Sequence, residues 1–126
     1  MKIMAVYFIY EDPFSNGLSV DSDIEGVVRQ NSIMFVKEFK VGESNKPHQR
    51  VKNLQTGNPR RLYIYKIIEC ATKARAKAVE NTIHKRFSKK RNSGEWFSIS
   101  KEEVDDICAE INRLHHIEWR KAKNVI

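Results

Sequence analysis

Four reactive side chains and one glycine stand out in this sequence: Tyr7, Lys40, Gly42, Arg50 and Glu80. They bring a phenol, an amine, a guanidinium and a carboxylate from separate parts of the chain. Such a set could bind a divalent metal ion, hold a phosphate and activate a water molecule. Those tasks are what hydrolysis of a phosphodiester requires, so a nuclease is the first hypothesis.

Glu80 is the candidate metal ligand. At about 100° per residue, it falls beside Phe87 at the border of the apolar stripe of a long predicted helix. A carboxylate there is partly shielded from water, and a bound metal ion would satisfy it. His84 lies one turn further along the same flank, within reach of the same site. A salt bridge to Lys77 explains Glu80 equally well, and His84 alone is more often a boundary residue than a catalyst.

The other three side chains also have an ordinary alternative each. Arg50 lies at the margin of a short predicted helix, where its planar fork would match two phosphate oxygens, although most arginines are simply exposed. Lys40 stands just before Gly42 at a strand end, where the missing side chain lets a phosphate backbone approach; the alternative is an exposed edge lysine. Tyr7 lies in an apolar strand, and a core tyrosine bonded to backbone is its commoner state.

The elements that must position these residues alternate between strands and helices. Apolar or alternating residues predict strands over 3–10, 33–42, 62–70 and 95–98. A short helix is expected from Pro47 to the stop at Gly57, Asn58 and Pro59, and a long helix from the Thr72 cap to about residue 90. A capping box of Ser100 and Glu103 opens a helix over about 101–121, with the stripe Val104, Ile107, Cys108, Ile111 and Leu114.

The expected fold is a single α+β domain over residues 1–126, with a core of about 3–99. Residues 11–32 form an acidic insertion, in which a short helix around Ile24, Val27 and Val28 could follow a cap at Asp21 or Ser22. Cys70 and Cys108 have no zinc-like spacing and are expected to be reduced core residues. With no membrane-length apolar run and no signal segment, we expect an intracellular protein that is neither secreted nor membrane-bound.

Charge is concentrated in the middle of the chain. The formal net charge is +7, but residues 37–100 hold sixteen Lys or Arg and only five Asp or Glu, a net charge of +11. Such a block favours a polyanionic partner, although a solvated basic face is the alternative. The side chains expected to contact nucleic acid through its phosphates are Lys46, Lys52, Arg60, Arg61, Lys85 and Lys89.

The order and spacing of these motifs resemble the GIY-YIG endonuclease superfamily. Ala5-Val6-Tyr7 stands where the GIY triplet would be, and Lys40-Val41-Gly42 where YIG would be. Arg50 follows at the family interval, and Glu80 falls in the next long helix. The run from Lys40 to Pro59, and His84 and Phe87 followed by Gly94-Glu95-Trp96-Phe97, are similar to the phage and viral branch.

The resemblance implies a three-stranded antiparallel sheet flanked by helices, which cuts DNA with Mg²⁺ or Mn²⁺. By resemblance, Glu80 would ligate the metal, Arg50 would hold the scissile phosphate, and Tyr7 would act as general base or position the attacking water. Since a phenol titrates near 10, a base role needs a cation that lowers its pKa, and Lys40 is placed by motif to be that cation.

Three departures qualify the resemblance. Lys40 replaces the second family tyrosine, the insertion at 11–32 lengthens the usual gap, and Leu54 stands where many members have a histidine, a place that His84 could take instead. The family's late asparagine would be Asn92. These departures leave open a catalytically weak or inactive module that binds nucleic acid or regulates. An adaptor that uses the insertion and the last helix, through Leu114, His115 and Trp119, is a third reading. RNA as substrate and a homodimer, which double-strand cleavage would favour, also stay open.

Overall fold

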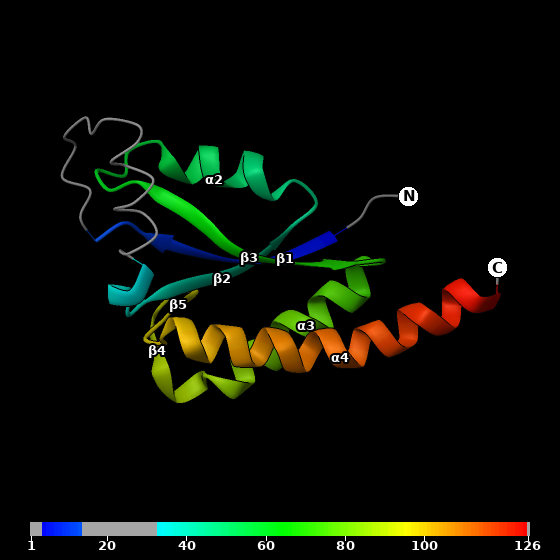
Figure 1. The fold of residues 1–126 in the computed structure, drawn as a ribbon. Helices are drawn as coiled ribbons and strands as arrows, with labels where there is room; N and C mark the ends of the chain where they lie inside the picture. The colour runs from blue at the N-terminus through cyan, green and yellow to red at the C-terminus, as the bar shows by residue number, and fades with distance from the viewer. Residues whose placement is uncertain (1–3, 14–32, 126) are drawn as a thin grey trace.

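The structure, a computed structural model, describes residues 4–13 and 33–125, with side chains as far as residue 113. One sheet has helices on both of its faces (Figure 1). The strands are β1 (Met4–Glu11), β2 (Phe39–Ser44), β3 (Leu62–Cys70), β4 (Arg91–Ser93) and β5 (Trp96–Phe97). The α-helices are α2 (Pro47–Gln55), α3 (Lys73–Arg86) and α4 (Lys101–Val125), and the 3-10 helices are η1 (Ile33–Phe35) and η2 (Ser88–Lys90).

The sheet is antiparallel and has the strand order β3-β1-β2-β5-β4. The three-stranded sheet predicted from the sequence is therefore too small, although its three long strands lie side by side as β3, β1 and β2. The strand that the sequence did not predict is β4, whose residues Arg91–Ser93 are all polar and exposed. Because β4 exists only through its pairing with β5, no apolar pattern marks it.

The second strand begins later than its sequence pattern predicts. Residues 33–35 form the 3-10 helix η1 instead, closed by a hydrogen bond from the Val36 N–H to the Ile33 carbonyl. The strand starts at Phe39, where it can pair with Phe97 of β5. The short helix expected around Ile24 lies outside the described residues, as does the acidic insertion from residue 14 to residue 32.

The two faces of the sheet carry separate cores. Alternate residues of β1, such as Val6 and Phe8, face α3 and α4, where they pack with Ile83 and Ile107. The intervening residues face α2, where Tyr7, Ile9 and Leu62 pack with Val51, Leu54 and Ile64. Figure 1 shows α2 on one side of the sheet and α3 with α4 on the other. Tyr7 therefore belongs to the α2 side and Ile83 of α3 to the opposite side.

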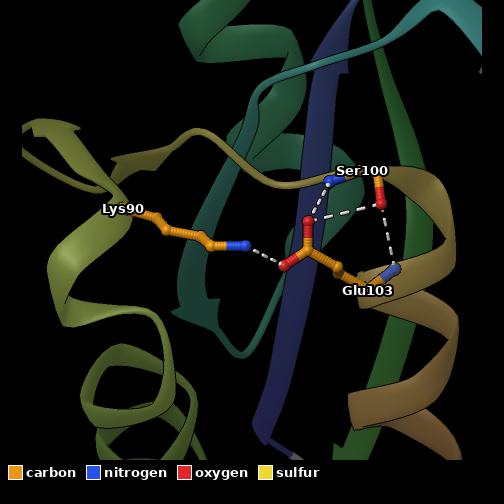
Figure 2. A network of polar contacts seen from close by, with 3 residues as sticks. All are labelled: Lys90, Ser100 and Glu103. Atoms are coloured by element: carbon orange, nitrogen blue, oxygen red, sulfur yellow. Dashed lines mark hydrogen bonds and ion pairs between the residues drawn. The ribbon is translucent and has the colours of Figure 1, made fainter.

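Local signals set most helix ends. The Thr72 hydroxyl caps α3 by accepting from the Arg75 N–H at 3.1 Å, as predicted. The helix ends at Arg86, however, because the chain tightens into η2 rather than continuing to residue 90. At α4, the Glu103 N–H donates to the Ser100 hydroxyl at 3.2 Å and the Ser100 N–H to the Glu103 carboxylate at 3.2 Å, which confirms the capping box. Figure 2 shows that Lys90 pairs with the same carboxylate.

The two cysteines and the last helix were also predicted from the sequence. Cys70 and Cys108 are buried free thiols, as predicted. Within the described ranges, no helix combines the length and the apolar character that a membrane span needs. The C-terminal helix α4 runs to Val125, beyond the predicted end near residue 121. His115 and Trp119 lie beyond residue 113, after which only the backbone of this helix is described.

Candidate active site

The Tyr7 ring lies across Gly42 of the neighbouring strand. The two residues are directly opposite in the β1–β2 register, and Tyr7 is 1% exposed. A methyl group at position 42 would lie 2.6 Å from the Tyr7 hydroxyl oxygen and 2.8 Å from Cζ, closer than any van der Waals contact. The Tyr7 phenol therefore fills the space beside Gly42. The expectation that a phosphate backbone could enter this space is wrong.

The cation beside the Tyr7 hydroxyl is Arg50. Its guanidinium, on the exposed first half of α2, makes a side-chain hydrogen bond with the phenol. Burial raises the pKa of Tyr7 above its ordinary value of 10.0, although Arg50 acts in the opposite direction. The phenol is therefore protonated at neutral pH. The expected cation, Lys40, is not the one that acts on it, and the expected lowering of the pKa is wrong.

Lys40 is held by the short strand that pairs with β2. Its Nζ lies 3.5 Å from a Glu95 carboxylate oxygen and 5.9 Å from the centre of the Trp96 ring. The Lys40 side chain is 17% exposed, so it is more shielded than an ordinary edge lysine. Glu95 also acts electrostatically on Tyr7. Lys40 is therefore linked to the phenol through Glu95 and not directly.

Glu80 comes to the site from the opposite face of the sheet. It is 5% exposed on α3, and its Oε1 lies 3.7 Å from Nζ of the exposed Lys77. Burial raises the pKa of Glu80, an effect that His84 and Lys77 oppose and that Glu43 and Glu95 strengthen. The salt bridge considered from the sequence is present, and the carboxylate is also largely withdrawn from water.

Arg50 and Glu80 both act electrostatically on Tyr7, although the three residues come from α2, α3 and β1. The phenol lies against Gly42 of β2, and α3 packs against the same strand. Glu95 acts electrostatically on both Tyr7 and Glu80. Tyr7 is thus within electrostatic range of two of the other predicted reactive side chains, and Lys40 is linked to it through Glu95.

Two buried polar atoms near Glu80 lack a hydrogen-bond partner among the described residues. They are Oε2 of Glu43 and Nε2 of His84. The His84 ring packs against Phe97 with the ring centres 5.0 Å apart, which fixes its position beside the hairpin of β4 and β5. Glu43 was missed from the sequence. The alternation of strand residues could have indicated Glu43. It stands two residues after the apolar Val41, so the two side chains lie on the same face of β2, the face that packs on α3.

A single divalent cation suits this donor set. Among the described residues, no three His, Cys, Asp or Glu side chains gather closely enough to hold a metal by themselves. Mg²⁺ is commonly held by one or two carboxylates, with water and substrate phosphate oxygens completing its shell. The buried Glu80 carboxylate and the unpartnered Glu43 oxygen offer hard oxygen donors of that kind.

The six side chains expected to bind nucleic acid are all exposed. Four of them lie on or beside α2 and two at the end of α3, in the order Lys46, Lys52, Arg60, Arg61, Lys85 and Lys89. Because α2 and α3 cover opposite faces, the set is divided between two sides of the sheet (Figure 1). Gln55 shapes the loop that carries the two arginines: its amide donates to the Arg60 carbonyl at 2.9 Å and accepts from the Leu62 N–H at 2.8 Å.

Asn92, suggested as the late family asparagine, has partners within its own part of the fold. Its amide donates to a Glu38 carboxylate oxygen at 2.8 Å and accepts from the Ser98 hydroxyl at 2.9 Å. These bonds tie the hairpin of β4 and β5 to the segment before β2. Asn92 thus helps to hold the strand that carries Trp96 next to Lys40.

Comparison with known proteins identifies a domain family for this chain. No curated protein and no solved structure matches the chain. The family model of the T5orf172 domain matches residues 25–112, which include β2, α2, β3, α3 and the first half of α4. The match covers Arg50 and Glu80 and leaves Tyr7 outside it. Since it spans more than half of the sequence, the chain belongs to the T5orf172 domain family, a phage-associated domain related to nuclease and DNA-binding families.

Proposed function

We propose that this protein is a metal-dependent endonuclease of the GIY-YIG type that hydrolyses DNA phosphodiester bonds. The observation that carries the proposal is the environment of Tyr7, which is 1% exposed and on which Arg50 and Glu80 both act electrostatically. Burial of both the phenol and the Glu80 carboxylate is costly unless these groups have a use. Membership of a family related to nucleases supports the same reading.

Each residue has a task that follows from its surroundings. Arg50 is exposed on α2, cannot lose its proton and can clamp two oxygens of the scissile phosphate. Tyr7 remains protonated, so it orients the attacking water or the phosphate by hydrogen bonding rather than removing a proton. Glu80 would hold the Mg²⁺ or Mn²⁺ ion. The bound ion would supply Lewis-acid stabilisation of the phosphate charge and a lowered pKa for a bound water.

Lys40 has a supporting task in the proposed mechanism. Its ion pair with Glu95 compensates a carboxylate that would otherwise repel both the phosphate and the charge on Glu80. The ammonium also lies 5.9 Å from the centre of the Trp96 ring, and the Lys40 side chain keeps 17% of its surface exposed, so a nucleic acid strand could contact it. Lys40 thus contributes positive charge near the phosphate without acting on the phenol.

The basic side chains would supply affinity without sequence preference. Contacts to phosphates release counterions, so the DNA binding constant should fall steeply with salt concentration. Because the basic residues lie on both faces of the sheet, a bound duplex would contact α2 and the end of α3 together only by crossing the sheet edge.

A binding module that has lost the chemistry is the second candidate. Two observations favour it: the protonated state of Tyr7, and the engagement of Lys40 by Glu95 in place of a second tyrosine. Such a protein would bind DNA through the same basic residues and leave it intact. The two candidates therefore differ in cleavage and agree in binding.

One assay separates them. Purified protein is incubated with supercoiled plasmid and Mg²⁺ or Mn²⁺, beside Glu80→Gln and the control Glu102→Gln, which changes an exposed carboxylate on α4. The proposal predicts metal-dependent conversion to the nicked form by wild type and by the control, and none by Glu80→Gln. Binding in a gel-shift assay without cleavage under either metal would leave the binding module as the function. A parallel incubation with single-stranded RNA tests the breadth of the substrate class.

A further inference from the structure

Glu43 lies on β2 with its side chain directed toward α3. It pairs with Val6 in the β1–β2 register and lies on the same face of β2 as Val41 and Phe39, both of which are fully buried in the core beneath the sheet. The helix packed on that face is α3, and Glu43 acts electrostatically on its Glu80. The two carboxylates therefore belong to elements that pack against each other beneath the sheet.

The charges of these two carboxylates are poorly compensated. Lys77 lies 3.7 Å from Glu80 Oε1, but its own side chain is 60% exposed and faces solvent. Oε2 of Glu43 is buried without a hydrogen-bond partner among the described residues. A buried carboxylate oxygen without a partner is costly, because it has lost its water and gained nothing in return. A bound cation is the simplest group that would satisfy both carboxylates together.

The edge of β2 next to Glu43 is free of strand pairing. The described pairing between β2 and β5 covers Phe39 and Lys40, and the Val41 N–H donates to the Glu95 carbonyl at 3.0 Å. Beyond Val41, that edge of β2 carries no further strand pairing within the described ranges. An ion held between β2 and α3 would take water and phosphate oxygens as the rest of its octahedral shell.

We propose that Glu43 is a second carboxylate ligand of the divalent metal ion, paired with Glu80. The inference rests on the proposed function and deepens it, since it assigns the metal site to two elements rather than to one. His84, whose buried Nε2 is the other unpartnered atom here, orients a water ligand of the ion. The pair is chemically suited to Mg²⁺ and Mn²⁺, which prefer oxygen donors.

The test measures metal binding without DNA or turnover. Mn²⁺ is titrated into wild type, Glu43→Gln, Glu80→Gln and the control Glu102→Gln, and free Mn²⁺ is followed by its electron paramagnetic resonance signal. Glu102 is the control because the same change of charge is made there at an exposed carboxylate on α4. We expect Glu43→Gln and Glu80→Gln each to weaken Mn²⁺ binding at least about tenfold. Glu102→Gln should change it by less than about threefold, which is under 1 kcal/mol.

A melting experiment in EDTA separates ligation from a structural role. Gln has the shape of Glu without its charge, so Glu43→Gln should fold and should melt no lower than wild type when metal is absent. Added Mn²⁺ should then raise the melting temperature of wild type more than that of the variant. A variant that melts well below wild type in EDTA would overturn the proposal, because the carboxylate would then be needed by the fold itself.

The remaining outcomes distinguish this inference from the proposed function. Loss of Mn²⁺ binding in Glu80→Gln with unchanged binding in Glu43→Gln overturns the second ligand and leaves the metal at Glu80 standing. If wild type does not bind Mn²⁺ in the absence of DNA, the proposal that Glu43 and Glu80 form a metal site in the free protein is overturned. Cleavage of plasmid DNA by that same protein would show that the nuclease proposal survives without it.

Discussion

Gly42→Ala should destabilise the protein through one contact. The added methyl group would lie 2.6 Å from the Tyr7 hydroxyl oxygen and 2.8 Å from Cζ. The ring is 1% exposed and packs with Ile9 and Leu62, so it has no free space to enter. Overpacking of this kind typically costs about 1–3 kcal/mol. For a chain of this length, about 2 kcal/mol corresponds to a fall in melting temperature of roughly 6–10 °C.

The assay is thermal unfolding of wild type, Gly42→Ala, Tyr7→Phe and the double variant, followed by circular dichroism. Tyr7→Phe removes the atom that the methyl group meets at 2.6 Å and leaves Cζ at 2.8 Å, so relief should be partial. The two changes should couple favourably by about 0.5 kcal/mol or more. If Gly42→Ala melted within about 1 °C of wild type, the close approach of the phenol to β2 would be refuted.

Three further predictions concern stability. In EDTA, Glu80→Gln should melt at a higher temperature than wild type at pH 7 and at the same temperature below pH 4.5. The folded state raises the pKa of Glu80 above its ordinary value of 4.5, so its contribution to stability is fully present below pH 4.5. That contribution is lost as the pH rises through the pKa of the folded state, where the buried carboxylate becomes charged. Glu103→Gln should cost up to about 1 kcal/mol in urea unfolding at pH 7. Because Lys90 lowers the pKa of Glu103, that cost should disappear as pH falls through the folded-state value. Ile107→Ala, at a site 1% exposed, should cost about 2–5 kcal/mol in the same urea assay.

Local chemistry explains the elements that the sequence predicted well. The strand at residues 62–70 has its predicted bounds because its aromatic and β-branched residues have no competing helical period. The Ser100 and Glu103 pair sets the start of α4 through contacts within one turn. Features that depend on three or four neighbouring residues could therefore be predicted from the chain alone.

Features that depend on distant partners could not be predicted. The short strand β4 exists only because β5 lies beside it, and β2 starts where Phe97 is available as a partner. In the candidate site, the order of motifs singled out Tyr7, Arg50 and Glu80. Only the fold shows that Lys40 forms an ion pair with Glu95 and that Glu43 acts electrostatically on Glu80. A charge pattern in sequence does not state which charges meet.

In the proposed mechanism, Glu80 acts in bond cleavage rather than in DNA binding. The most direct test is the single-turnover rate of strand cleavage in an end-labelled duplex, with Mg²⁺ and saturating protein, for wild type and Glu80→Gln. We predict a rate at least about 100-fold lower for Glu80→Gln. Its DNA dissociation constant should stay within about threefold of wild type. An unchanged cleavage rate in Glu80→Gln would contradict the claim.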